Sequence, residues 1–169
     1  MPAKVGTGST YTGATDIKGG VLKVNGSLAS ASTVTVQRGT LAGSGTVAGS
    51  VTVKNGGKIA PGSSAGTLNT GALTLESGSV LDFELGAPGA SDLIAVTGNL
   101  TLDGVVNVAG LEGFGERAYT LMTYTGTVTD NGMEVGSTPV NNNLRYAIHA
   151  DAGVVTLSVY SRRTVIMVR

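Results

Sequence analysis

One strand phrase occurs four times in this chain, as Val34-Thr35-Val36, Val51-Thr52-Val53, Leu73-Thr74-Leu75 and Leu100-Thr101-Leu102. A glycine follows each copy after a few residues: Gly39, Gly56, Gly78 and Gly104. The copies begin 17, 22 and 27 residues apart, so they share a pattern and not a fixed length. Such a pattern is typical of the coils of a β-solenoid, in which similar strands alternate with loops of unequal size.

The composition favours ordered β structure with many turns. Glycine makes up 27 of 169 residues, about twice its usual ~7% share. Disordered glycine-rich chains combine low hydrophobicity with high charge, whereas this chain is 41% hydrophobic and only 13% charged. Aromatic residues are only 4%, which suits thin coils filled by Val, Leu, Ala and Thr.

Charge and cysteine content exclude several classes of function. Lys plus Arg equals Asp plus Glu at 11 each, so no excess charge favours a nucleic acid or an anionic membrane as partner. No stretch approaches the ~18 apolar residues of a membrane helix, and we predict no membrane span. The absence of cysteine excludes disulfides, thiolate catalysis and cysteine-based metal sites. Residues 1–6 lack the apolar core of a signal peptide, so we expect another export route or a leader upstream of this sequence.

Strands of three to five residues separated by glycine corners predict a right-handed parallel β-helix, an all-β fold. No window has apolar residues at helical spacing. Strands over residues 79–85, 93–97, 99–103 and 105–108 are longer and alternate clearly, and a loop at 110–117 and hairpin-like segments follow them. We expect solenoid coils over residues 1–108, ending near Val108. Segments 118–124 and 126–129 are expected to pair with each other, with a turn at Asp130-Asn131-Gly132.

We predict a hairpin-rich end over residues 109–160, within the same domain. Segments 144–150 and 154–160, joined at Asp151-Ala152-Gly153, have the pattern of an antiparallel hairpin. The hairpins would cover the last coil, because an open solenoid end exposes unpaired backbone and apolar side chains. The basic, aliphatic tail at residues 161–169 is interpreted as one more edge strand or an extension, with a docking strand for a neighbouring subunit as the alternative.

Several short phrases resemble autotransporter passenger domains of the β-strand-repeat type. Residues 10–26, with Tyr-Thr-Gly followed by Gly-Gly-Val-Leu-Lys-Val-Asn-Gly, resemble the autotransporter-associated repeat itself. Residues 59–68 and 91–102 are similar to phrases frequent in the same passengers. Residues 119–126 and 154–159 are similar to their membrane-proximal end. The resemblance extends over nearly the whole chain.

This resemblance implies a right-handed β-helix displayed on, or released from, a Gram-negative cell. Such passengers often work as adhesins or rigid stalks, and their C-terminal part commonly serves as a folding nucleus. A self-translocating member continues into a membrane translocator, for which too few residues follow Tyr160. We therefore expect either a piece of a longer passenger or a stand-alone protein built from the same coils.

Asp82, Glu84 and Asp92 are the densest carboxylates in the sequence. Asp82 and Glu84 are two residues apart, so they share one strand face and could form a glycosidase pair or bind Ca²⁺. The simpler interpretation is a solvated strand face, because no Arg or Lys lies close by in sequence. In that case the inward side chains are Val80, Leu81, Phe83 and Leu85. We predict no catalytic, cofactor-binding or metal-binding residue.

The remaining candidates have weaker support. His149 is the only histidine, with Asp151 on the same strand face if the strand reaches that far, and a surface hairpin histidine is the simpler interpretation. Ser63 and Ser64 lie in a Gly/Pro turn outside any Gly-x-Ser-x-Gly elbow. The pair Gly19-Gly20 opens no helix that could cradle a phosphate, and the Asn141-Asn142-Asn143 run is interpreted as a loop rather than an asparagine ladder.

These observations predict a non-enzymatic extracellular structural or adhesive module, a passenger-type stalk without cofactors. The alternative is a self-assembling subunit of an extracellular filament or sheath, stacked head to tail through the solenoid ends. A β-helix enzyme acting on polysaccharide is the third possibility. The partners expected are further copies of the chain or a glycan or protein at a cell surface.

Overall fold

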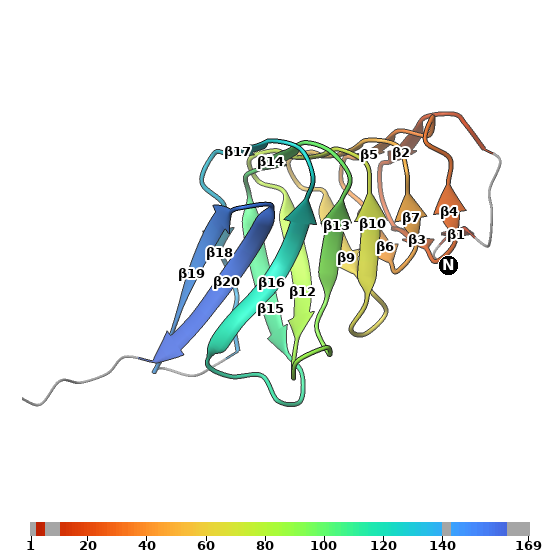
Figure 1. The fold of residues 1–169 in the computed structure, drawn as a ribbon. Coiled ribbons are helices and arrows are strands. Elements are labelled where there is room, and N and C mark those ends of the chain that lie inside the picture. The colour runs from red at the N-terminus through yellow and green to blue at the C-terminus, as the bar shows by residue number, and fades with distance from the viewer. Residues whose placement is uncertain (1–2, 6–10, 140–142, 162–169) are drawn as a thin grey trace, which may run out of the picture.

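The computed structural model describes residues 3–5, 11–139 and 143–161, which form twenty strands arranged in three sheets (Figure 1). Sheet A is formed, in spatial order, by β1 (Ala3–Val5), β3 (Val21–Val24), β6 (Thr40–Gly43), β9 (Lys58–Pro61), β12 (Val80–Leu85), β15 (Val105–Gly110) and β18 (Glu134–Val135). Sheet B is formed by β2 (Thr15–Ile17), β5 (Val34–Val36), β8 (Val51–Val53), β11 (Leu73–Leu75), β14 (Leu100–Leu102) and β17 (Val128–Asp130). Sheet C is formed by β4 (Ser27–Leu28), β7 (Thr46–Val47), β10 (Thr67–Thr70), β13 (Leu93–Val96), β16 (Arg117–Tyr124), β20 (Val154–Ser161) and β19 (Leu144–Asp151).

The chain visits sheets B, A and C in turn and then returns to sheet B one strand further along the axis. Each strand pairs in parallel with its counterpart in the next coil, as with β5 and β8, up to β18 in sheet A, β17 in sheet B and β16 in sheet C. Figure 1 shows the coils winding as a right-handed helix from the N-terminal end. The predicted fold, a right-handed parallel β-helix, is confirmed.

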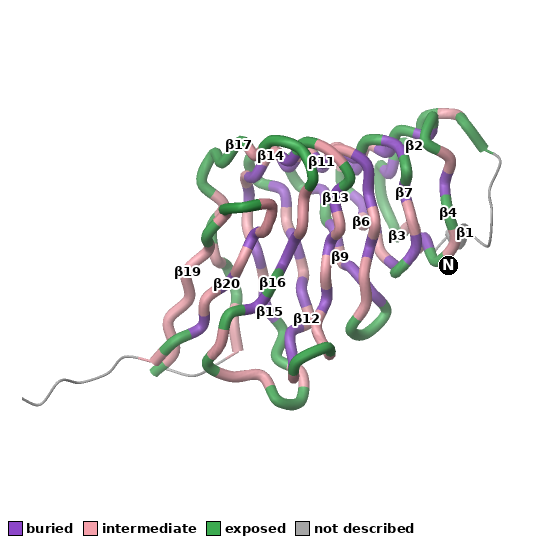
Figure 2. The backbone as a smooth tube through the Cα atoms, in the orientation of Figure 1, coloured by how far each residue is buried: buried purple, intermediate pink, exposed green. Residues whose placement is uncertain are grey.

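The repeated phrase forms sheet B. Val51 pairs with Val34 on one side and with Leu73 on the other, and Thr52 lies between two threonines in the same way. The Val and Leu residues of these strands are buried and the threonines are partly exposed, so the Val and Leu face is the inward one. Figure 2 shows how buried and partly exposed residues alternate along the coils. Each residue therefore stacks on a similar residue of the next coil, and columns of apolar side chains run along the axis of the β-helix.

Parallel pairing continues beyond Val108. β17 pairs with β14 and β18 with β15, so the coils extend to Val135. The expected pairing of segments 118–124 and 126–129 with each other is wrong, because they lie in sheets C and B. The intervening residues form a coil corner, in which Gly126 donates to the carbonyl of Gly98 at 2.9 Å.

The predicted antiparallel hairpin is confirmed as β19 and β20, which pair over eight residue pairs. Its two-residue turn has positive φ at both positions, 49° at Ala152 and 83° at Gly153, as a tight hairpin turn requires. β20 pairs antiparallel with β16, whose other edge pairs in parallel with β13. Side chains of β19, among them Tyr146 and Ile148, pack against the end of the core.

Three segments that the sequence singled out lie outside the described residues. They are the tail at residues 162–169, most of the N-terminal segment 1–10 and the asparagines Asn141 and Asn142. Among the described residues, no helix is long and apolar enough to cross a membrane.

Truncating one inward side chain tests the stacked core. Leu73→Ala removes a side chain that is 1% exposed, and we expect a loss of about 2–5 kcal/mol in the free energy of unfolding. The matched change Thr74→Ala lies next to it on the partly exposed face and should cost well under half as much. Urea titration of both variants measures the difference, and equal losses would contradict the assigned inward face.

The glycines that close the repeats can be tested in the same way. Gly104 has φ of 80°, and a Cβ at this position would overlap the backbone of Ser79 in the preceding coil. At Gly19 a Cβ would meet no atom within 4 Å. Gly104→Ala should therefore lower the thermal midpoint by several degrees, whereas Gly19→Ala should leave it nearly unchanged. A neutral Gly104→Ala would show that this corner is not constrained.

Candidate ligand-binding site

The long loops of the molecule gather where sheet A leads into sheet C. At this corner the first two coils have connections of two residues, 25–26 and 44–45. The next three connections have five, seven and six residues, 62–66, 86–92 and 111–116. We name these three connections the loop corner. Figure 1 shows them side by side along the lower edge of the helix, below β9, β12 and β15.

Hydrogen bonds hold these loops in place. The backbone N–H of Ala87 donates to the carbonyl of Glu112 at 3.0 Å, and that of Gly86 donates to Ser91 Oγ at 3.0 Å. Leu111 donates to the carbonyl of Leu85 at 2.8 Å, which continues the sheet A pairing into the loops. The loop corner is thus an ordered projection rather than a loose set of turns.

Asp92 ties two of the loops to sheet A. Its side chain is 1% exposed, and it accepts hydrogen bonds from the backbone N–H of Gly66 at 3.0 Å and of Glu84 at 2.8 Å. Burial raises the pKa of Asp92 from 3.8 to about 6, which the two N–H donors oppose and the Glu84 carboxylate reinforces. Only glycine fits at position 62 beside this carboxylate, because φ of Gly62 is 77° and a Cβ there would approach Asp92 Oδ1 to 2.6 Å.

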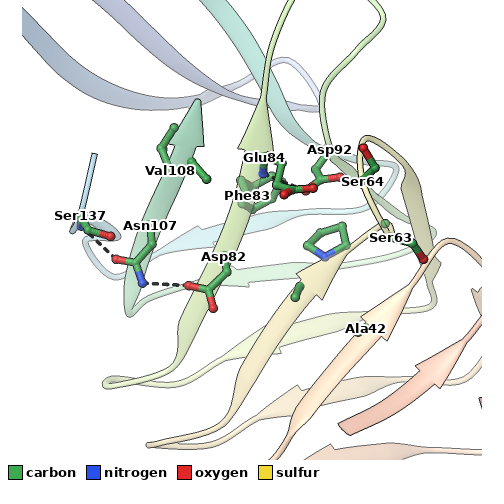
Figure 3. A pocket seen from close by; sticks show the side chains of 14 residues that line it. Ala42, Ser63, Ser64, Asp82, Phe83, Glu84, Asp92, Asn107, Val108 and Ser137 are labelled. Atoms are coloured by element: carbon green, nitrogen blue, oxygen red, sulfur yellow. Dashed lines mark hydrogen bonds between the residues drawn. The ribbon is translucent and has the colours of Figure 1, made fainter. Parts of the chain in front are cut away.

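A hollow of about 460 Å³ lies between the outer face of sheet A and loop 62–66 (Figure 3). Its polar lining includes a hydrogen-bonded row across three successive coils. Asn107 Nδ2 donates to Asp82 Oδ1 at 2.8 Å, and Asn107 Oδ1 accepts from the backbone N–H of Ser137 at 2.9 Å. Small residues form the floor on the N-terminal side, Ala42 and Ala60.

The three carboxylates predicted to be neighbours, Asp82, Glu84 and Asp92, all line this hollow. Asp82 and Glu84 share the outer face of β12, as expected, but Val80 points outward with them, so only Leu81, Phe83 and Leu85 are inward. Lys58, one coil away, brings Nζ to 3.4 Å from Asp82 Oδ2. Sequence reasoning missed this lysine because it precedes Asp82 by 24 residues.

Most of the carboxylates that line the hollow are held by contacts within the chain. Two of its carboxylates are already engaged, Asp82 by Lys58 and Asn107, and Asp92 by two backbone N–H groups. Glu84 and the exposed Ser63 and Ser64 also line it. Among the described residues, no three His, Asp or Glu side chains are grouped closely enough to hold a metal ion.

A second hollow of about 410 Å³ lies on the sheet C side of loop 86–92, so Asp92 forms part of the wall of both. Several contacts hold Tyr119, which lines this hollow. The ring of Tyr119 stacks on Phe114 at 5.4 Å, and its hydroxyl donates to the carbonyl of Gly115 at 3.1 Å. The Arg117 guanidinium lies over the Tyr119 ring and donates to Gly113 at 3.1 Å.

The other predicted candidates lie away from the loop corner. His149 and Asp151 are exposed on β19, which does extend to Asp151, and neither lines the two hollows. Gly19 and Gly20 form the corner between β2 and β3, where Gly20 has φ of 71°. Asn143, the described member of the asparagine run, is exposed before β19.

The coils, the loop corner and the end hairpin define the class of protein as a right-handed parallel β-helix. No family model matches the chain. It is 48% identical over 92 residues to the "Adhesin BmaC autotransporter" of Brucella suis biovar 1 (strain 1330), a match covering 49% of this chain and 3% of that protein. It is 38% identical over 102 residues to the "Extracellular serine protease" of Serratia marcescens, covering 60% of this chain and 10% of that protein. The matches support a passenger-like region over part of the chain, which spans only a small fraction of either relative.

The buried Asp92 predicts a pH dependence of stability with a definite sign. The pKa of Asp92 is about 6 in the folded chain and 3.8 in the unfolded chain. The stabilisation contributed by the protonated carboxyl is therefore complete below pH 3.8 and is lost as the pH rises through about 6. Between pH 4 and 7 the wild-type chain should lose about 1–3 kcal/mol of unfolding free energy relative to Asp92→Asn.

Chemical denaturation at several pH values measures this difference. Asp130→Asn, a change at an exposed carboxylate on β17, serves as the control and should follow the wild type. A wild-type chain that gains stability relative to Asp92→Asn over this range would show that the two N–H donors outweigh burial.

Proposed function

We propose that this chain is a non-enzymatic extracellular module of the autotransporter passenger type, a rigid stalk with an adhesive edge. The observation that carries the proposal is the loop corner. Lengthening is concentrated at one of the three corners of each coil, where three successive loops form one projecting surface. A β-helix with only a structural role would not need such an asymmetry.

The geometry of the loop corner favours binding over catalysis. The two hollows lie on either side of loop 86–92 and are lined by hydroxyls, carboxylates, Arg117 and Tyr119. A glycan or protein at a cell surface could contact both hollows and the loop between them. The carboxylates Asp82 and Asp92 hold structural hydrogen bonds, so we assign them to positioning the surface and not to acid–base chemistry.

The similarity to a protein named an autotransporter adhesin supports both the adhesive role and a location outside a Gram-negative cell. The second relative is named an extracellular protease, and its similarity is lower, at 38% identity. We infer that the shared part is the β-helical stalk and that proteolysis belongs to other parts of that relative.

Head-to-tail assembly into a filament or sheath is the alternative function. Sheets A and B end in parallel-paired strands, β18 and β17 at the C-terminal side and β1 and β2 at the N-terminal side. Two of the three sheets therefore keep an edge that a second copy could continue. Negative-stain microscopy of the purified chain tests this alternative, since filaments would favour it and isolated particles would exclude it.

Shortening the loops tests the adhesive proposal. In one variant residues 62–66 are replaced by Ser-Gly, the connection used at 44–45, and in another residues 87–90 are replaced by a single glycine. Binding to arrays of glycans and of immobilised extracellular-matrix proteins should fall roughly tenfold or more, because both changes remove walls of the hollows.

The control is the double change Thr97→Ala and Asn131→Ala at the other two corners, which should leave binding unchanged. Melting temperatures of all variants verify that the coils still form. The proposal fails if the wild-type chain binds neither array, or if both loop-shortened variants bind as well as the wild type.

A further inference from the structure

Among the described strands, which form six sheet edges, one edge differs from the rest. The edges formed by β1, β2, β4, β17 and β18 are strands of two or three residues. β19, the last strand of sheet C, has eight residues. Short edge strands offer too few backbone groups for another chain to pair with, whereas a long one is a template for strand addition.

β19 also lacks several features that usually protect a long edge, namely proline, lysine and a bulge. Its sequence, Leu-Arg-Tyr-Ala-Ile-His-Ala-Asp, contains no proline, glycine or lysine. All eight residues pair with β20 without a register shift, so the strand carries no bulge to turn its edge aside. In Figure 1 this strand lies at the far C-terminal end of the molecule, beyond the last coil.

The side chains of β19 are complementary to a second, antiparallel copy of the same strand. Arg145 lies three residues before Ile148, and Asp151 lies three residues after it. Two copies that run antiparallel and meet at Ile148 place each Arg145 directly opposite Asp151 of the second copy. Opposite charges at directly facing positions stabilise such a pair, and the twofold symmetry supplies the contact twice.

The other face of β19 fits the same arrangement. Leu144, Tyr146, Ile148 and Ala150 alternate with the charged face and pack on the end of the core, but they are only partly buried. In the antiparallel pair, Ile148 faces Ile148 of the second copy and Tyr146 faces Ala150 of the second copy. Association would therefore cover apolar surface that the hairpin leaves partly exposed.

We propose that the chain forms a twofold dimer through antiparallel pairing of β19, which joins sheet C of the two copies into one continuous sheet. The contact uses the same strand on both copies and so closes, unlike the head-to-tail contact of a filament. It uses neither hollow, and the dimer presents two loop corners. The inference is independent of the proposed adhesive function.

Charge exchange tests the dimer, with mass in solution measured by light scattering after size exclusion over a wide range of concentrations. Arg145→Asp and Asp151→Arg each place like charges opposite one another twice, and each should weaken association roughly tenfold or more. The double variant restores both attractive contacts. An equimolar mixture of the two single variants should also dimerise, because every facing pair is then one Asp and one Arg.

The mixture is the decisive sample, since a charge pair within one chain would be restored in the double variant but not by mixing. Asp130→Arg, on the short edge strand β17, is the matched control and should dimerise like the wild type. Melting temperatures confirm folding of each variant. A monomeric wild-type chain, single variants that dimerise normally or a mixture that stays monomeric would each overturn the proposal.

A cross-link gives a second measurement. The chain has no cysteine, so a single introduced thiol can form a disulfide only between two copies. Ile148→Cys places the two thiols at the twofold axis, and mild oxidation should give a covalent dimer. Ser77→Cys, in an exposed corner, is the control. Equal cross-linking of both variants would contradict pairing centred on Ile148.

Discussion

The backbone ladder between successive coils is the interaction on which the whole molecule depends. Each strand hydrogen-bonds to its counterpart about 4.8 Å away along the axis, and the register must place Val or Leu above Val or Leu. In sheet B this register is continuous from Val34 through Val51 and Leu73 to Leu100. A shift by one residue would turn these side chains to the solvent and the threonines into the core, so the alternation itself enforces the register.

The ladder constrains the strands but leaves the connections free, and this explains the unequal repeat. Most of the added length between coils lies at the loop corner and in the strands that flank it. The other corners stay short and bring glycine into close contact with the preceding coil, as at Gly71 against Gly49. Two corners of each coil therefore keep a nearly constant length, and the loop corner contains the connections whose length varies.

Short strands, glycine corners, the parallel β-helix and the end hairpin were all predictable from the sequence, because each depends on a local pattern. The point at which the coils end was not. β17 and β18 pair with strands nearly thirty residues earlier, and whether a segment pairs with its neighbour or with the coil below depends on register. The contact of Lys58 with Asp82 and the burial of Asp92 could not be predicted for the same reason, since both depend on contacts between residues of different coils or loops. Residues far apart in a sequence become neighbours in a coil only once every loop length is known.

β16 is the strand at which the molecule changes from parallel to antiparallel pairing, and this has a mechanical consequence. A stack of coils can unfold one coil at a time from an end whose terminal strand is weakly paired. At the C-terminal side the last coil is held by antiparallel pairing, because β20 pairs with β16 and β19 pairs with β20 over eight residue pairs. At the opposite side β2 is joined to β5 by only three. The two ends therefore differ in mechanical stability. Under force applied at the N-terminus, the coils would unfold one after another from that side while the antiparallel strands at the C-terminal side stay folded.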